Sequence, residues 1–277
     1  MTSTEEIAQR IRKDIIWSIY HAKSGHPGGS LSCSDILTVL FHKIMSPPLT
    51  YNRLSEDSFI LSKGHAAPAL YAAAATKGLL SISELKSLRS LNSPLQGHPD
   101  VKHLPWVDIS TGSLGQGFSV AVGVAKGLQI KKSPNRVFTL LGDGELQEGQ
   151  VWEAAMFSGH HGLSQLTVII DYNKLQSDAS NREICNLEPL SDKWKSFGWQ
   201  VLNIDGHDHP SLLAALSEQN ISKPKVIIAH TIKGKGVNFM ENMPLWHGSV
   251  TLSIQQYNDA MVALGCSARE LEEYENV

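Results

Sequence analysis

The chain has 277 residues, a formal charge of −3 and a sequence pI near 6.4, with 42% hydrophobic and 18% charged residues. These values are ordinary for a globular protein large enough for one α/β domain, and they give no electrostatic basis for binding nucleic acid or a membrane. Three widely separated cysteines without a CxxC pair indicate neither a disulfide framework nor a zinc site. With no signal peptide and no membrane-spanning apolar run, a cytoplasmic protein is expected.

The first third of the chain alternates predicted helices with glycine-rich loops. Apolar spacing predicts an amphipathic helix over residues 4–23 and a second helix over 34–45. Three glycines and a proline predict that Ser24-Gly25-His26-Pro27-Gly28-Gly29, between them, is a folded loop. A predicted buried strand over 57–62 is followed by Lys63-Gly64-His65-Ala66-Ala67-Pro68, a helix to about 77, a short helix over 83–91, and the loop Gln96-Gly97-His98-Pro99.

A glycine-rich turn precedes the middle of the chain. Residues 108–117 read DISTGSLGQG and lead into a predicted small-residue helix over 118–128. Close approach of the backbone to a ligand would explain these glycines, and so would helix–helix packing through Gly123 and Gly127.

The most informative stretch joins two strands through one helix. Apolar runs over 137–141 and 166–170 are typical of buried strands, and residues 151–158 have helical spacing. This order is the βαβ unit of a parallel sheet, which binds ligands at the carboxyl ends of its strands. The strands end in Gly142-Asp143-Gly144 and Asp171-Tyr172-Asn173, so Asp143 and Asn173 are expected side by side.

These two strand ends have the chemistry of a metal–diphosphate site. Carboxylate and amide oxygens suit a hard divalent cation that also holds phosphate oxygens. The glycines beside Asp143 would let backbone N–H groups approach a diphosphate. Gly142-Asp143-Gly144 alone could be a plain tight turn, and Asn173 an ordinary loop residue; their placement around one βαβ unit favours the site.

The remaining residues continue the α/β pattern. A polar loop is predicted over 176–192, followed by buried strands over 198–205 and 225–231 with a helix over 210–218 between them. His207 is expected to be structural. A loop with Lys233 to Gly236 and Trp246-His247-Gly248 precedes one or two helices over 252–277. Without a linker or repeat, residues 1–277 are predicted to form a single domain with a parallel sheet flanked by helices.

At this point the motifs resemble a known family. Gly142-Asp143-Gly144 followed by Asp171-Tyr172-Asn173 resembles the thiamin diphosphate signature, in which a metal ion binds the diphosphate. SGHPGGS, SKGHAAPALYA, TGSLGQG and GDGELQEG extend the resemblance to transketolase, and to its diphosphate-binding half in particular. The match runs from about residue 7 to residue 249 in the same motif order and implies the thiamin-diphosphate-binding fold.

The resemblance also implies roles for individual residues. It implies that Asp143, Asn173 and the Leu175 carbonyl bind Mg²⁺ or Ca²⁺, and that the cofactor contacts His65, Gly112, Ser113, Leu114, Gly144, Asn173 and His247. His26, His98 and His247 would contact substrate, and histidine suits proton transfer because its ordinary pKa is near the working pH. Glu148 matches a buried glutamate that communicates across the assembly interface; the alternative is a solvated helix charge. Ser113 replaces the usual proline of the family, which is expected to loosen its turn.

The implied activity is ketol transfer with thiamin diphosphate as cofactor, as in the pentose phosphate pathway. A two-carbon unit would pass from a ketose to an aldose. Full transketolases continue into a pyrimidine-binding domain, which supplies the glutamate that activates the cofactor, and into a third domain. Both are expected on a separately encoded partner subunit, in a hetero-oligomer with two copies of each subunit.

Several other functions remain open on the sequence. The chain could be a fragment of deoxyxylulose phosphate synthase or of a pyruvate dehydrogenase-type decarboxylase, although SKGHAAP and GDGELQEG fit transketolase better. It could serve a related enzyme that acts on an apiose or sulfosugar intermediate. It could also be a non-catalytic cofactor-binding subunit, which the joint presence of His26, His65, Asp143, Asn173 and His247 disfavours.

Overall fold

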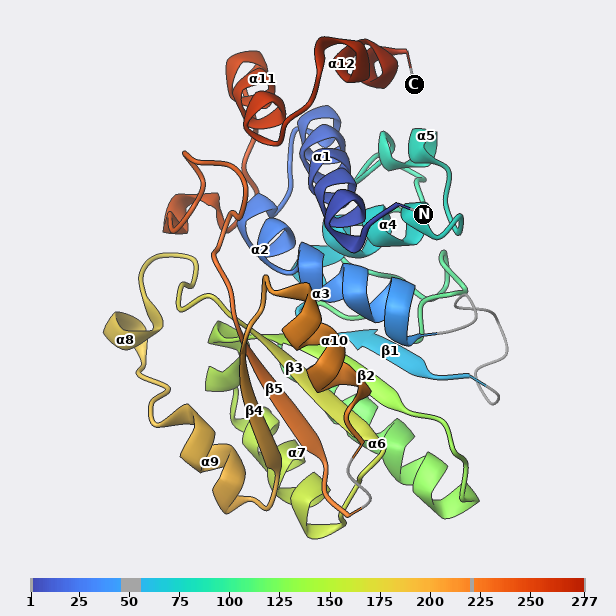
Figure 1. Cartoon of the computed structure of the whole chain (residues 1–277), viewed down its shortest axis with the longest axis vertical. Coiled ribbons are helices and arrows are strands. Elements are labelled where there is room, and N and C mark those ends of the chain that lie inside the picture. The colour runs from blue at the N-terminus through green and yellow to red at the C-terminus, as the bar shows by residue number, and fades with distance from the viewer. Residues whose placement is uncertain (1, 46–55, 220–221, 277) are drawn as a thin grey trace.

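A computed structural model describes residues 2–45, 56–219 and 222–276. Within these residues the centre is a five-stranded parallel sheet with the strand order β1-β2-β3-β5-β4 (Figure 1). Its strands are β1 (Ser58–Leu61), β2 (Val137–Gly142), β3 (Leu166–Tyr172), β4 (Gln200–Asp205) and β5 (Lys225–His230). The predicted parallel sheet is therefore confirmed, and Gly142 pairs in register with Asp171.

The sheet is buried on both faces, and successive residues of its inner strands point to opposite sides. Ile169 packs into the hydrophobic cluster on one face, and Val168 and Ile170 pack into the cluster on the other. This two-residue period explains why the strands read as continuous apolar runs in the sequence.

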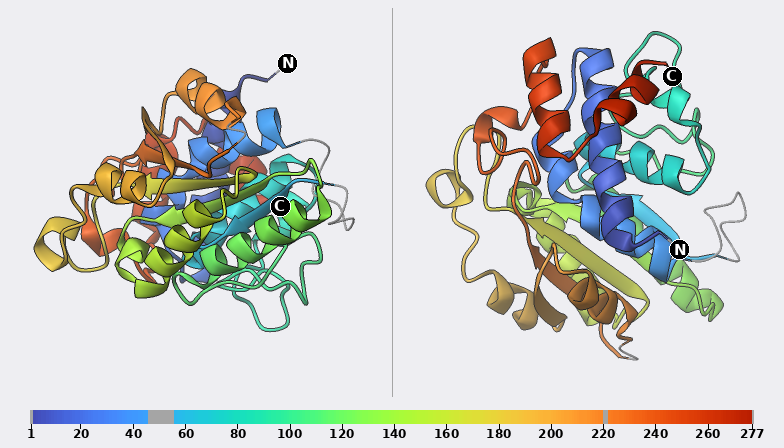
Figure 2. Two further views of the ribbon diagram at one scale, coloured as in Figure 1. Left: turned by 90° about the horizontal axis from the view of Figure 1, so that it is seen from below. Right: turned by 45° about the horizontal axis from the view of Figure 1, so that its top comes forward.

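Helices cover both faces, as both views in Figure 2 show. One face carries α1 (Thr4–Ala22), α3 (Ser34–Val39, continued by a π-helix over Leu40–Ile44), α4 (Ala67–Thr76) and α10 (His209–Ser217). The other face carries α6 (Gln116–Lys131), α7 (Gly149–His160) and α9 (Leu190–Ser196). The C-terminal helices α11 (Ile254–Ala263) and α12 (Ala268–Glu275) pack near α1, where the Tyr274 hydroxyl lies 2.5 Å from Asp14 Oδ1. Val277 lies outside the described residues.

The predicted loop at residues 24–29 is in part wrong, because α2 (Pro27–Ser32) begins inside it. Proline is well suited to the first turn of a helix, where its missing N–H has no intrahelical partner. All six residues of α2 are buried, and a Cβ on Gly28 would lie 2.8 Å from the Trp246 carbonyl oxygen. Close packing therefore explains these glycines.

Three other boundaries differ from the predictions. The helix expected over 83–91 is limited to α5 (Ile82–Leu85), and the positive φ of Arg89 (59°) is incompatible with its continuation. The loop expected over 176–192 contains α8 (Asn181–Ile184), which has a Ser180–Glu183 capping box, and the start of α9. The strand expected to be buried over 198–205 is the edge strand β4, with partly exposed residues.

Helix packing through Gly123 and Gly127 is absent among the described residues. A Cβ built on either glycine meets no atom within 4 Å. Close approach to a neighbouring helix within this chain therefore does not explain them.

None of the helices in the described part of the chain combines the length and apolar character needed to cross a bilayer.

Candidate active site

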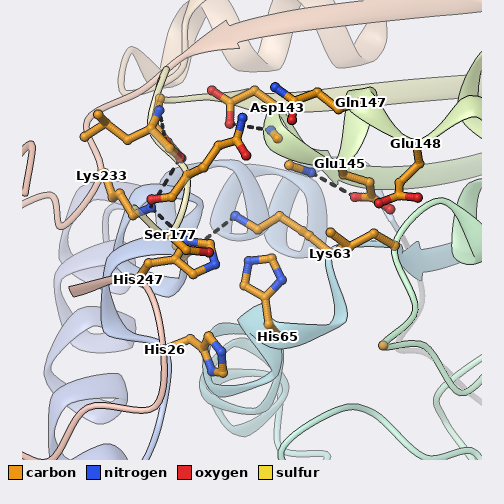
Figure 3. Close-up of a pocket in the computed structure, with 18 residues that line it drawn as sticks. His26, Lys63, His65, Asp143, Glu145, Gln147, Glu148, Ser177, Lys233 and His247 are labelled. Atoms are coloured by element: carbon orange, nitrogen blue, oxygen red, sulfur yellow. Dashed lines mark hydrogen bonds between the residues drawn. The ribbon is translucent and has the colours of Figure 1, made fainter. Parts of the chain in front are cut away.

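A cavity of about 320 Å³ opens at the carboxyl ends of β2 and β3. Eighteen residues line it, and Figure 3 shows their side chains. They include ten of the residues assigned from the sequence: His26, His65, Gly112, Leu114, Asp143, Gly144, Glu148, Asn173, Leu175 and His247. His98 and Ser113 are not in the lining, although the Cβ position on Gly112 is only 3.2 Å from His98 Cδ2.

The four motif histidines form one cluster, although they come from four separate segments. The His26 ring centroid lies 5.4 Å from that of His65, 6.5 Å from that of His98 and 6.0 Å from that of His247. The His65 and His247 rings are 5.2 Å apart. Figure 3 draws His26, His65 and His247 together at one side of the pocket.

Burial lowers the pKa of each of these histidines. The pKa of His26 is lowered to about 4, with a further contribution from Arg89, whose guanidinium is 3.3 Å from His26 Nδ1. The pKa of His247 is lowered to about 3 by burial and then by Lys233, and that of His65 falls well below its usual range. The pKa values of these four rings thus lie below the ordinary value for histidine. At pH 7 the rings are neutral.

Two buried lysines face the same cavity. Lys63, 1% exposed, donates to Asp171 Oδ2 at 2.5 Å and to the Gly29 carbonyl at 2.9 Å. Lys233, also 1% exposed, donates to the carbonyl oxygens of Leu175 at 3.2 Å and Gln176 at 2.8 Å. Burial, and then the nearby charge of Lys63, lowers the pKa of Lys233 to about 8. Lys233 has no carboxylate within salt-bridge distance among the described residues, so an anion in the cavity would stabilise its charge.

Asp143 is the acidic counterpart of Lys233, because burial disfavours its charged form as well. Its carboxylate is 2% exposed and accepts hydrogen bonds from the backbone N–H groups of Lys174 and Gly144. Burial, and then the charge of Asp171, raises the pKa of Asp143 to about 7. A divalent cation at this carboxylate would compensate for both effects.

The other two expected metal ligands, Asn173 and the Leu175 carbonyl, belong to residues that line the same cavity as Asp143. Asn173 Oδ1 accepts from Leu175 N at 3.1 Å, and Asn173 Nδ2 donates to Asp171 Oδ2 at 3.4 Å, which turns the amide oxygen away from Asp171. No group of three or more His, Cys, Asp or Glu side chains suited to a metal occurs in the parts of the chain that are described. The oxygen set of Asp143, Asn173 and a backbone carbonyl instead fits Mg²⁺ or Ca²⁺.

The donor set as a whole fits a metal-bound diphosphate. Three polar groups of one cavity lack a full complement of partners. The Asp143 carboxylate and the Lys233 ammonium have pKa values shifted toward their neutral forms, and the buried Gln176 Nε2 has no hydrogen-bond partner in the described structure. A cation at Asp143 and an anion between it and Lys233 would satisfy these groups together.

Glu148 is exposed in the isolated chain and does not lie within the helix as expected. It is the residue before α7 and follows a 3₁₀ turn over Gly144–Gln147. Glu145, in that turn, is the buried glutamate, with 2% of its area exposed.

Four further polar residues of the site have no role implied by the motifs: Lys63, Glu145, Asp171 and Lys233. All four stand inside quoted motifs, SKGHAAP, GDGELQEG, DYN and KGKG. Lysine and glutamate are usually exposed, so composition gave no reason to expect them in the interior. The sequence signal that could have indicated a role for them is their position at or near the carboxyl ends of strands.

Comparisons with known proteins agree with this geometry. Residues 3–272 match the family described as "Transketolase, thiamine diphosphate binding domain". The chain is 42% identical over 260 residues to the 6-deoxy-6-sulfo-D-fructose transketolase subunit SqwG of Clostridium sp. (strain MSTE9), covering 93% of this chain and 94% of that relative. It is 36% identical over 272 residues to a subunit of apulose-4-phosphate transketolase from Phocaeicola vulgatus, covering 97% and 96%.

Solved structures show the same fold. The crystal structure of transketolase from Campylobacter jejuni superposes with a TM-score of 0.89 at 30% identity, over 99% of this chain and 46% of that chain. The chain thus spans less than half the length of that enzyme, but nearly the whole of the two subunit relatives. The family match, the relatives and the pocket agree, and the chain belongs to the transketolase family through its thiamin diphosphate-binding domain.

Proposed function

We propose that this chain is the thiamin-diphosphate-binding subunit of a two-subunit transketolase. The observation that carries the proposal is the coverage of the relatives. Two proteins named as transketolase subunits match 93% and 97% of this chain along 94% and 96% of their own lengths. The required partner would carry the pyrimidine-binding domain, and the assembly would hold two copies of each subunit.

The proposed cofactor site uses both sides of the cavity. Asp143, Asn173 and the Leu175 carbonyl would hold Mg²⁺ or Ca²⁺. Lys233 would release the Leu175 carbonyl to the metal and turn its ammonium to the diphosphate. The backbone of Gly144 and the rings of His65 and His247 border the same space. The turn from Gly112 to Leu114 would lie along the cofactor, with Ser113 on its exposed side.

Thiamin diphosphate, when bound, supplies the nucleophilic carbon needed to break the bond beside a ketose carbonyl. The chain's own contribution would be positioning and proton handling. Neutral His26 and His247 can donate a hydrogen bond to a developing alkoxide or accept one from a substrate hydroxyl. His98 is more exposed and would contact substrate at the pocket rim. Glu148, exposed in this chain, would be covered in the assembly.

The donor sugar is a separate part of the proposal. The relatives are named for 6-deoxy-6-sulfo-D-fructose and apulose 4-phosphate, so either compound is a candidate beside an ordinary ketose phosphate. The test is a ketol-transfer assay with thiamin diphosphate, Mg²⁺ and an aldose phosphate acceptor. It compares xylulose 5-phosphate, 6-deoxy-6-sulfo-D-fructose and apulose 4-phosphate as donors, for the chain alone and with its genomically adjacent candidate partner.

The outcomes separate the parts of the proposal. Turnover only in the mixture supports the two-subunit enzyme, and the preferred donor identifies the substrate. Turnover by the chain alone contradicts the partner requirement. Cofactor binding without turnover on any donor favours a non-catalytic binding subunit.

A further inference from the structure

Glu145 is a buried carboxylate at the cavity to which the proposed function assigns no role. It follows Asp143 by two residues and lines the pocket with 2% of its area exposed. Its Oε1 accepts from the Gly115 N–H at 2.8 Å and from the Ser62 hydroxyl at 2.5 Å, and its Oε2 accepts from the Gly142 N–H at 3.0 Å. Burial raises the pKa of Glu145, and these three donors oppose that shift.

The three donors belong to three different elements. Ser62 follows β1, Gly142 ends β2, and Gly115 precedes α6. Ser62 extends the network, because its Oγ accepts from the Phe118 N–H at 3.0 Å. One carboxylate thereby connects two strand ends to the start of the helix that follows the glycine-rich turn.

The glycine-rich turn also has neutral hydrogen bonds: the Leu114 carbonyl accepts from Gln150 Nε2 at 2.8 Å, and the Gly115 carbonyl accepts from the Ser119 N–H at 3.2 Å. Gly115 has φ +82°, a conformation that glycine adopts readily and from which it can also depart readily. The φ dihedral of Ser113, in the same turn, is not fixed by a ring, whereas a proline at this position would fix it. Gly112 and Leu114 line the cavity on the same turn, so rotation at Gly115 would move both.

Direct packing shows how closely the turn must be held. A Cβ on Gly117 would lie 2.7 Å from Ser62 Cα, and one on Gly64 would lie 2.9 Å from Gly112 N. The backbones after β1 and before α6 are therefore in contact, and small shifts would be transmitted between them. Charge-assisted hydrogen bonds are stronger than neutral ones, so a carboxylate is an effective restraint here.

We propose that Glu145 is a positioning residue: its carboxylate fixes the turn 112–115 against the cofactor side of the pocket. It acts through backbone N–H groups and not on substrate. This inference rests on the proposed cofactor site, and it predicts that Glu145 and residue 113 are energetically coupled.

The test is a double-mutant cycle with Glu145→Gln and Ser113→Pro, read out by calorimetric titration of thiamin diphosphate with Mg²⁺ into the chain and its partner. Glutamine has nearly the shape of glutamate, but its NH₂ group must face at least one of the backbone N–H donors. Proline at 113 keeps the carbonyl that accepts from Gln116 N at 3.3 Å. Glu145→Gln should weaken cofactor binding about tenfold, the order of one charge-assisted hydrogen bond. Ser113→Pro should tighten binding more in the Glu145→Gln background than in the native one.

Two further measurements separate positioning from general stability. Hydrogen exchange at Gly115 and Phe118 should accelerate in Glu145→Gln, even without cofactor. Glu270→Gln is the matched control, because Glu270 binds Lys13 at 2.7 Å far from the pocket; it should lower stability and leave cofactor affinity unchanged.

Equal cofactor affinity of wild type and Glu145→Gln, or additive effects of the two substitutions, would overturn the inference while the proposed function stands. A wild-type assembly that binds no thiamin diphosphate would contradict the proposed function and, with it, the cofactor role of Glu145. Unchanged exchange at Gly115 would show that Glu145 does not hold the turn.

Discussion

His26 and His247 lie 6.0 Å apart, with pKa values lowered to about 4 and about 3. Both rings are therefore neutral at pH 7 and can act as hydrogen-bond donor and acceptor. A diphosphate near His247 and His65 would oppose the lowering, because an anion stabilises the protonated ring. The charge of these histidines should thus depend on the ligand as well as on pH.

The lowered pKa values predict how stability depends on pH. In the unfolded chain a histidine binds a proton near pH 6.5, whereas folded His26 does so only near pH 4. The unfolded state therefore binds more protons between these values, and the free energy of unfolding should decrease as pH falls from about 6.5 to 4. Urea unfolding of wild type and His26→Asn at pH 7, 6, 5 and 4 measures the slope. Identical slopes for the two proteins would contradict the assignment to His26.

The pair of Lys63 and Asp171 gives a second prediction. Both side chains are buried and 2.5 Å apart, with the pKa of Asp171 lowered and that of Lys63 raised, the latter because Asp171 outweighs burial. Asp171→Asn should destabilise the chain by about 3 kcal/mol, because it leaves a buried ammonium without its counter-ion.

Chemical denaturation measures this effect. Glu273→Gln is the control, since its ion pair with Arg269 is exposed and should contribute less than about 1 kcal/mol. Similar small losses in the two variants would mean that the buried pair does not stabilise the fold as described.

At the residue scale, the sequence was informative where a motif carried the assignment. Ten residues with motif-based roles line the pocket, whereas the motifs SKGHAAP and KGKG imply no role for Lys63 and Lys233, which they contain. A lysine is normally solvated, whereas these two are buried and both lie against α2: Lys63 donates to the Gly29 carbonyl, and a Cβ on Gly28 would lie 3.1 Å from carbons of the Lys233 side chain. The burial of Glu145 could not be read from the sequence, because linear spacing does not reveal which side chain a 3₁₀ turn directs inward.

At the scale of elements, α2, which directly follows His26, packs against the segments that carry Lys233 and His247. A Cβ on Gly28 would lie 2.8 Å from the Trp246 carbonyl and 3.1 Å from carbons of the Lys233 side chain. Gly28→Ala should therefore displace the segment that carries His247 and destabilise the chain by about 1–3 kcal/mol.

Gly123→Ala is the matched control within α6. A Cβ there meets nothing within 4 Å, and alanine favours helix over glycine by about 1 kcal/mol, so this variant should be slightly stabilised. Thermal unfolding of the isolated chain compares the two. A stabilised Gly28→Ala protein would contradict the close packing described for α2.

The pattern of apolar residues predicted the long helices and the inner strands. Short helices such as α2 do not follow from this pattern, because their stability depends on neighbouring segments. The apolar runs of β2 and β3 were recognisable because both faces of the sheet are covered. The helix α2 was not, since its glycines favour loops and only burial by neighbouring segments stabilises it. The exposure of β4 depends on its place at the sheet edge, and strand order cannot be read from alternation along the chain.

At the scale of the whole molecule, the sheet topology gathers segments that lie far apart in sequence. His26 and His247 are separated by most of the chain, yet both border the ends of β2 and β3. The predicted parallel sheet placed Asp143 and Asn173 together, because both follow the carboxyl ends of its strands. It did not predict the histidine cluster, which only the family resemblance implied.

The histidine cluster predicts an effect on turnover in the assembled enzyme. His26→Ala and His98→Ala should each lower ketol transfer by about 10²-fold, the usual contribution of a proton-transferring or alkoxide-binding group. His103→Ala, at an exposed ring 2.8 Å from Asp100, is the control and should retain activity. Unchanged turnover in both cluster variants would remove the proposed substrate contacts.

In the proposed site, this pocket binds thiamin diphosphate through a metal held at Asp143. The most direct test is calorimetric titration of thiamin diphosphate, with and without Mg²⁺, into the chain alone and with its partner. Wild type and an Asp192→Ala control, altered at an exposed residue on α9, should show the same metal-dependent binding. Asp143→Ala should bind at least about tenfold more weakly. Binding by Asp143→Ala with wild-type affinity and the same metal dependence would contradict the account.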